Sequence, residues 1–255
     1  MAHLLICATQ RSGSTLVAEL LAQTGVAGLP DEHLLLWLRE RHRTEPAFWL
    51  ETLQRTVDAG STKNGVFSCK VMASYFAEAM DLLRVIPGGE GLDCWEIATR
   101  AFVGPKVVRV RRRERLRQAI STYIAESTGV WHMARRAGAS DPFLRGALAP
   151  RNDAHAAELP FDYERIKSHL FGIDAGERWW DELLAKHGVQ PFEIVYEEFV
   201  AARRVQICAI LDFLGVAYDP AALRLEEHLD RLSNATNERF LALYREEAAR
   251  RGERV

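Results

Sequence analysis

The segment HLLICATQRSGST, residues 3–15, holds the clearest structural signal in the chain. Its first part, His3–Ala8, is a short apolar run, as expected of a strand buried on both faces of a sheet. A polar turn follows, and beyond it apolar residues recur three and four positions apart, at Leu16, Val17, Leu20 and Leu21. That spacing predicts a helix with one apolar face. A buried strand, a glycine-containing turn and a helix in direct succession indicate an α/β unit.

The same alternation continues along the chain. Further strands are predicted at Gly65–Met72, Pro105–Arg111 and Phe192–Val195. Helices are predicted at Leu34–Arg43, Ala47–Ala59, Phe76–Val85, Glu114–Ser127, Tyr163–Lys186, Arg203–Leu214 and Ala235–Arg251. Short apolar strands between helices favour a parallel β-sheet flanked by helices. We therefore expect an α/β fold in a single domain over residues 1–255, with a mainly helical C-terminal part.

The composition limits the possible functions. With 48% hydrophobic and 27% charged residues and a net charge of −2, the chain has the profile of a globular protein and not of a general nucleic-acid binder. Four widely spaced cysteines form no C-x-x-C pair, and Cys7 and Cys69 lie in apolar runs, which favours buried free thiols in a reducing compartment. No apolar run approaches the ~18 residues of a membrane span, and MAHLLICAT lacks the features of a secretion signal. We expect a cytoplasmic protein.

The turn after the first strand, Thr9–Thr15, has the features of an anion site. Backbone N–H groups at a helix start have no intrahelical partner and attract negative charge. Gly13 would let an anion approach the backbone, and the side chains available to contact it are Arg11, Ser12, Ser14 and Thr15. The alternative is an ordinary helix start capped by Ser12 or Ser14. The pattern G-x-x-x-x-G-K-[ST] of nucleoside-triphosphate loops is absent, which disfavours a kinase or an ATPase.

The turn after the third strand is rich in arginine: residues 111–121 read RRRERLRQAIS. Several cations at a helix start oppose the helix dipole, and a bound anion would relieve that clash. Ser121 lies eight residues after Arg113 and could join it around one phosphate. The alternative is a solvated basic face, neutralised by Glu114 and nearby acids. Two separate anion sites suit a nucleotide with phosphates at both ends of its ribose, which is the shape of 3′-phosphoadenosine 5′-phosphosulfate (PAPS).

Further segments carry recognisable patterns in the same order. They are Gln10–Leu16 (R-[ST]-G-S-T-L), Gly25–Glu32 (G-x-x-G-x-P-x-E), Val66–Met72 (F-x-x-K-[LV]-M), Arg112–Ser121 (R-R-x…Q-A-[IV]-S), Thr128–Trp131 and Val195–Phe199. Together they resemble the sulfotransferase superfamily, and most closely the bacterial trehalose 2-sulfotransferase family. The resemblance implies a P-loop-like sulfotransferase fold. It also implies transfer of a sulfuryl group from PAPS to a hydroxyl group, with adenosine 3′,5′-bisphosphate as the product and no metal.

The resemblance assigns roles to individual residues. Those that would bind the 5′-phosphosulfate are Gln10, Arg11, Ser12, Gly13, Ser14 and Thr15, and Arg113 with Ser121 would bind the 3′-phosphate. In the transfer step, Arg11 and the amides of Gly13–Thr15 would stabilise the departing 5′-phosphate, and Ser14 could donate to the bridging oxygen. Many sulfotransferases have a lysine where this chain has Gln10, so Arg11 or Lys70 would have to supply that charge. Lys70, placed at a strand end, is either a donor to the transferred group or an ordinary edge-strand lysine.

Glu32 is the predicted general base, because the resemblance places a catalytic acid there. Its alternative role is to cap the helix that starts near Leu34, which Asp31 could do equally well. His33 is a second candidate for the base. Histidine at this position departs from the aromatic residue usual in the family. This chain therefore need not contact its acceptor as the trehalose enzymes do.

The acceptor is expected to be a small molecule with a hydroxyl group, such as trehalose, a glycolipid or a secondary metabolite. Trp131 and His132 are candidates to line its site, and core packing is the alternative for Trp131. Arg231–Asn234 could cover the 3′-phosphate or simply cap the helix after it. No His, Cys, Asp or Glu cluster has metal-ligand spacing. The resemblance also allows a homodimer.

Two other functions remain open at this point. An atypical nucleotide-dependent kinase would need a metal-binding acid after an apolar strand, and no Asp or Glu stands immediately after any of the predicted strands. A non-catalytic module that binds adenosine 3′,5′-bisphosphate or PAPS would keep both anion sites but have no use for Glu32.

Overall fold

The computed structural model describes residues 3–131, 158–226 and 235–253. The candidate residues His132 and Arg231–Asn234 lie outside these ranges. The chain forms two compact units, each built from two stretches: residues 1–111 with 176–226, here the sheet unit, and residues 112–175 with 227–255, here the helical unit. Helix α7, Tyr163–Lys186, contributes to both. The single domain expected from the sequence stays a prediction.

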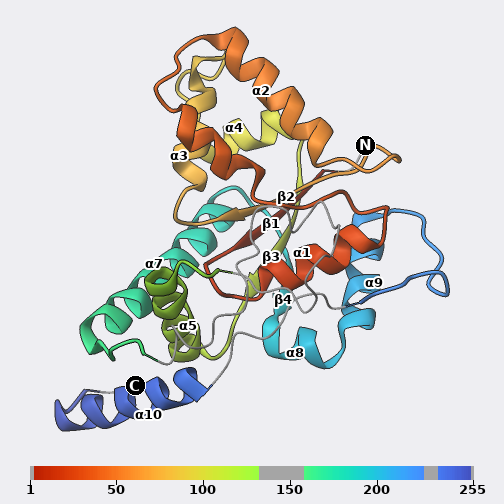
Figure 1. Cartoon of the computed structure of the whole chain (residues 1–255). Helices are drawn as coiled ribbons and strands as arrows, with labels where there is room; N and C mark the ends of the chain where they lie inside the picture. Colours follow the sequence, from red (N-terminus) through yellow and green to blue (C-terminus); the bar gives the residue numbers. More distant parts are fainter. Residues whose placement is uncertain (1–2, 132–157, 227–234, 254–255) are drawn as a thin grey trace. The chain divides into compact units, whose positions relative to one another are not determined.

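The sheet unit contains a four-stranded parallel sheet (Figure 1). Its strands are β1 (His3–Ala8), β2 (Phe67–Met72), β3 (Lys106–Arg111) and β4 (Phe192–Val195), in the order β2-β1-β3-β4. β1 is central, and Leu4–Ala8 are fully buried, because helices cover both faces of a parallel sheet. β1 and β3, the strands that lead into the two predicted anion sites, are neighbours. The predicted α/β fold with a parallel sheet flanked by helices is confirmed.

Helices surround this sheet. They are α1 (Ser14–Gln23), the 3-10 helix η1 (His33–Glu40), α2 (Pro46–Ala59), α3 (Phe76–Asp81), η2 (Leu82–Val85), α4 (Cys94–Ala101), the end of α7, α8 (Tyr196–Ala201) and α9 (Arg203–Leu214). Figure 1 shows α2, α3 and α4 gathered beyond β2. The α-helix predicted from Leu34 is a 3-10 helix, and α4 was not predicted individually. Its start carries a capping box between Asp93 and Glu96, a signal visible in the sequence.

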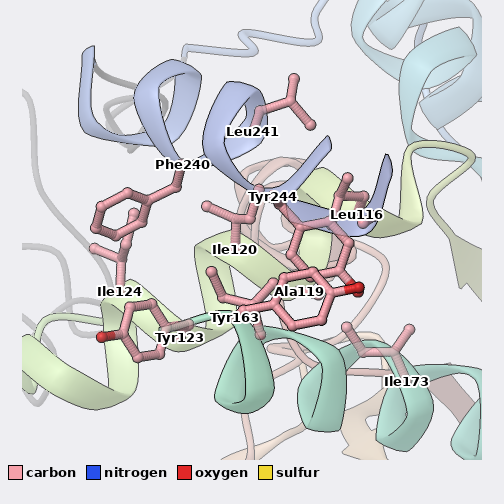
Figure 2. Close-up of a cluster of buried hydrophobic side chains, with 12 residues drawn as sticks. Leu116, Ala119, Ile120, Tyr123, Ile124, Tyr163, Ile173, Phe240, Leu241 and Tyr244 are labelled. Atoms are coloured by element: carbon pink, nitrogen blue, oxygen red, sulfur yellow. The ribbon is translucent and has the colours of Figure 1, made fainter. Parts of the chain in front are cut away.

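Among the residues that the structure describes, the helical unit contains α5 (Arg115–Thr128), the first part of α7 and α10 (Ala235–Arg250). Figure 2 shows side chains of the three helices meeting in one apolar core. Its residues are Leu116, Ala119, Ile120, Tyr123, Ile124, Tyr163, Ile166, Ile173, Phe240, Leu241, Tyr244 and Ala248. The rings of Tyr163 and Tyr244 stack with their centroids 4.5 Å apart. This core determines which face of α5 is buried, and therefore which of its side chains point to solvent.

Cys7 and Cys69 are free and buried, as predicted. Burial raises the pKa of both thiols, that of Cys69 to about 12. Trp180 is buried against Phe76 with ring centroids 5.1 Å apart. Among the helices that the structure describes, none has the length and apolarity needed to cross a membrane.

Candidate functional site

The turn between β1 and α1 has an unusual backbone. Arg11 has a φ of 60° and Gly13 a φ of 94°, both left-handed, whereas Ser12 between them is not left-handed. Left-handed residues in such a turn are typical of anion-binding concavities, which backbone N–H groups line. A left-handed arginine is strained, and strain of this kind persists where the surroundings hold it, often at functional sites. The geometry agrees with an anion site at this turn.

The start of α1 is not capped by a side chain. Gly13 is the N-cap of α1, and no side chain accepts a hydrogen bond in the capping position. Neither Ser12 nor Ser14 therefore acts as the predicted cap. The Ser12 side chain is fully buried, and its Oγ has no hydrogen-bond partner among the described residues. A buried hydroxyl group without a partner is costly, and a phosphosulfate oxygen would supply the missing acceptor. The loop fits such a ligand.

Gly13 is required at this position for a second reason. A Cβ atom built on Gly13 would overlap the ring of Tyr196, which lies against the loop. Tyr196 is the first residue of α8, directly after β4. Its segment resembled the family pattern, but the sequence did not reveal this contact, which depends on the pairing of β4 with β3. The first residue after β4 thus packs against the loop.

Glu32, Lys70 and Thr15 meet in one polar cluster. Lys70 Nζ lies 3.0 Å from Glu32 Oε1 and donates a hydrogen bond of 2.9 Å to Thr15 Oγ1. Thr15 is the second residue of α1, so Lys70 connects the predicted base to the start of the helix that follows the candidate anion turn. The Lys70 side chain is 2% exposed and that of Glu32 is 23% exposed. Three predicted site residues from three elements are therefore brought together.

Lys70 is not the ordinary edge-strand lysine that the sequence left open, nor does it end its strand. It is the fourth of six residues in β2, opposite Ile6 of β1, and its side chain is buried. A buried ammonium group is costly unless it is paired and hydrogen-bonded. Glu32 and Thr15 provide those partners here.

Glu32 does not cap the helix that follows it. Its backbone N–H donates to Asp31 Oδ1 over 2.7 Å, and its carboxylate makes no capping bond with η1. The backbone of Asp31 runs beside β2, where its carbonyl accepts the Lys70 N–H over 3.0 Å. This short parallel contact is what aims the Glu32 side chain at Lys70.

His33 is less suited to be the base in this arrangement. Its Nε2 lies 2.9 Å from the Leu29 carbonyl oxygen. Because a carbonyl only accepts hydrogen bonds, Nε2 carries the proton and only Nδ1 is left to accept one.

Tyr75 belongs to the cluster, although no motif pointed to it. Its hydroxyl group lies 3.2 Å from Glu32 Oε2 and 3.3 Å from the Lys70 carbonyl oxygen, and can donate to either. Burial and the adjacent Glu32 charge raise its pKa well above the ordinary value, so it remains a donor. Its position three residues after β2 is the available signal, because ligands of parallel sheets bind beyond the carboxyl ends of strands.

The arginine-rich turn starts α5 in the helical unit. Some of its arginines match the solvated-face alternative: Arg117 pairs with Glu114 over 3.2 Å and also with Glu238. In the sheet unit, Arg111 Nε donates to Glu193 over 3.0 Å. Arg113 is exposed just before α5, and Ser121 is partly buried two turns into it. Their phosphate-binding role stays a prediction.

Trp131 follows α5 and is 39% exposed, so it is not the core residue that the sequence left open. Its proposed contact with an acceptor stays a prediction.

The chain was compared with known proteins. The family model described as Stf0 sulphotransferase matches residues 3–247. Trehalose 2-sulfotransferase of Mycobacterium tuberculosis (strain ATCC 35801 / TMC 107 / Erdman) is 28% identical over 276 aligned positions, which cover 97% of this chain and 96% of the relative. Trehalose 2-sulfotransferase of Mycolicibacterium smegmatis (strain ATCC 700084 / mc(2)155) is 26% identical with the same coverage. The match spans both compact units, and this chain belongs to the Stf0 sulphotransferase family.

Proposed function

We propose that this protein transfers a sulfuryl group from PAPS to a hydroxyl group of a small carbohydrate acceptor, with Glu32 as the general base. The observation that carries the proposal is the buried Lys70, held between the Glu32 carboxylate and the first turn of α1. Membership of the family supports sulfuryl transfer. The names of the two relatives support trehalose as the first acceptor to test, with a glycolipid or another metabolite as alternatives.

The residues divide the work as follows. PAPS supplies the sulfuryl group. The N–H groups of Gly13–Thr15, the Ser12 hydroxyl group and the Arg11 charge hold the 5′-phosphosulfate, and Ser14 donates to the oxygen of the bond that breaks. The acceptor oxygen forms a bond to sulfur while the bond to the 5′-phosphate breaks. The electron pair of the broken bond leaves with adenosine 3′,5′-bisphosphate, and the acceptor proton passes to Glu32.

Lys70 acts both on the proposed base and on the group that leaves. Its ammonium group, 3.0 Å from Glu32 Oε1, orients the carboxylate that takes the acceptor proton. The same charge, fixed beside Thr15, favours negative charge at the phosphosulfate as the bridging bond breaks. We also propose a cytoplasmic location, supported by the buried free thiols of Cys7 and Cys69.

Incubation of the protein with ³⁵S-labelled PAPS and trehalose tests the proposal. Labelled sulfate should appear on trehalose, and adenosine 3′,5′-bisphosphate should be released in equal amount. Omission of the acceptor is the control. If no acceptor from a cell extract is labelled although the nucleotide binds, the protein is a binding module and not an enzyme.

The two-site model for the nucleotide makes a separate prediction. Adenosine 3′,5′-bisphosphate should bind far more tightly than AMP, and Arg113→Ala should remove most of the difference. A charge-assisted contact to phosphate contributes about 1.5–3 kcal/mol, or roughly 10–150-fold in affinity. Titration calorimetry measures both ligands. Arg165→Ala is the matched control, because Arg165 lies in the same unit and pairs with Glu126. Equal affinities for the two nucleotides in the wild type would refute the model.

A further inference from the structure

A buried ion pair lies under the phosphosulfate loop and has no part in the proposed chemistry. Arg109, in the middle of β3, is fully buried, and one of its terminal nitrogens (Nη2) lies 2.8 Å from Glu177 Oε2. The other (Nη1) donates to the Cys7 carbonyl oxygen over 3.3 Å. Glu177 belongs to the part of α7 that lies in the sheet unit. The pair thus joins β3, β1 and α7.

The second carboxylate oxygen of Glu177 reaches the loop itself. Thr9 Oγ1 donates to Glu177 Oε1 over 2.6 Å, across 168 positions of sequence. Thr9 is the first residue after β1, and its carbonyl oxygen accepts the Ser12 N–H over 3.3 Å. Thr9 therefore begins the turn in which Arg11 and Gly13 adopt left-handed conformations.

Helix α7 approaches the loop closely at this point. A Cβ atom on Gly176 would lie 3.0 Å from Thr9 Cγ2, so a larger residue there would push against Thr9. One turn further along, Trp180 Nε1 donates to the Ala8 carbonyl oxygen over 3.0 Å. The last residue of β1 and the first residue of the loop are thus both held by α7.

This arrangement is an expensive way to gain stability alone. Apolar residues of similar volume often stabilise a core as well as a buried ion pair does. The ion pair instead fixes the orientation of the Glu177 side chain, because one carboxylate oxygen contacts Arg109 and the other contacts Thr9. Fixing Glu177 fixes the Thr9 side chain, and with it the start of a loop whose strained backbone has to be held by its surroundings.

We propose that Glu177 is a positioning residue for the nucleotide loop. Held by Arg109, it holds Thr9. Through Thr9 it keeps the turn at residues 10–13, and with it the N–H groups of Gly13–Thr15, in the anion-binding conformation before the ligand arrives. The identity of that ligand as the 5′-phosphate of a nucleotide rests on the proposed function.

Thr9→Val is the variant that tests the proposal. It removes the donor to Glu177 and keeps the shape of the side chain, whereas Thr9→Ser retains the donor. Glu177→Gln is less informative, because it takes the charge partner from a buried guanidinium group and weakens the whole unit. Thr56→Val is the matched control: it removes a buried threonine hydroxyl group of the same unit, which accepts from Trp37 over 3.0 Å, away from the loop.

Two ligands separate a positioning role from general destabilisation. In Thr9→Val, adenosine 3′,5′-bisphosphate should bind about tenfold more weakly, the scale of one hydrogen bond to a charged group. Adenosine 3′-monophosphate, which lacks the 5′-phosphate, should bind as it does to the wild type. Thr9→Ser and Thr56→Val should bind both ligands within about twofold of the wild type. Equal weakening of both ligands in Thr9→Val, or no weakening of either, would overturn the inference.

Hydrogen exchange without ligand tests the same inference independently of the function. The amides of residues 10–13 should exchange faster in Thr9→Val than in Thr9→Ser or Thr56→Val. If these amides exchange at the wild-type rate in Thr9→Val, Glu177 has no positioning role, whatever the protein binds. Failure of the wild type to bind adenosine 3′,5′-bisphosphate counts instead against the proposed function, so the two failures are distinguishable.

Discussion

Glu32→Gln is expected to lower kcat by about 10²–10⁴-fold, the contribution of a positioned general base. The amide retains the shape of the side chain and its hydrogen bond with Tyr75, but it cannot take the acceptor proton. The affinity for adenosine 3′,5′-bisphosphate should stay within a few-fold of the wild type, since the partners of the carboxylate are the side chains of Lys70 and Tyr75. Initial rates with PAPS and the acceptor, together with calorimetry, measure both quantities.

Two neighbouring residues test whether the loss of activity is specific to Glu32. Asp31→Asn is the matched control, because the neighbouring side chain only accepts the Glu32 N–H and an amide oxygen can do the same. His33→Asn should also keep most of its activity. A Glu32→Gln enzyme within a few-fold of the wild type would move the role of base elsewhere.

Lys70→Met is expected to lower kcat by about 10²–10³-fold, as the loss of one preorganised charge at a reacting centre does. Methionine keeps most of the length of the side chain and tolerates a buried site, so the strand should retain its packing. The effect on the KM for the acceptor should be smaller than the effect on kcat, because the Lys70 charge matters most as the bridging bond breaks. Steady-state kinetics separates the two constants.

Two comparisons decide whether the lysine acts in the chemical step. Lys63→Met replaces an exposed lysine of the same unit and should leave both constants unchanged. The double variant Glu32→Gln with Lys70→Met should lose less activity than the product of the single losses, because residues that act as a unit are not additive. Additive losses would mean that the 3.0 Å ion pair has no part in a shared step.

The sequence predicted most of the fold because the relevant patterns are local. β1, β4 and α7 begin and end where expected, since apolar runs and helical spacing are visible within a few residues. The helix α9 likewise ends at Gly215, which adopts the left-handed conformation of a helix cap. η1 was mistaken for an α-helix because its apolar spacing does not distinguish the tighter turn.

The candidate site was predictable only in part. The loop after β1 could be found because its glycine, hydroxyl groups and arginine are contiguous. The burial of Lys70, the donor Tyr75 and the support from Glu177 depend on which strands and helices come together in space. Nothing near Thr9 in the sequence indicates a partner 168 positions away. Such contacts follow from the sheet order and the path of α7, and become visible only once the chain is folded.

The distance in sequence between the loop and its supports also bears on how the protein is made. Residues 9–15 leave the ribosome early, but Glu177 and Tyr196 are added about 160–180 residues later. At about 5–20 residues per second, this delay is roughly 8–36 s. During this time the nascent chain carries the loop's residues without the side chains that hold them in place. The loop conformation that we propose for nucleotide binding therefore gains its supports only after about three quarters of the chain has been synthesised.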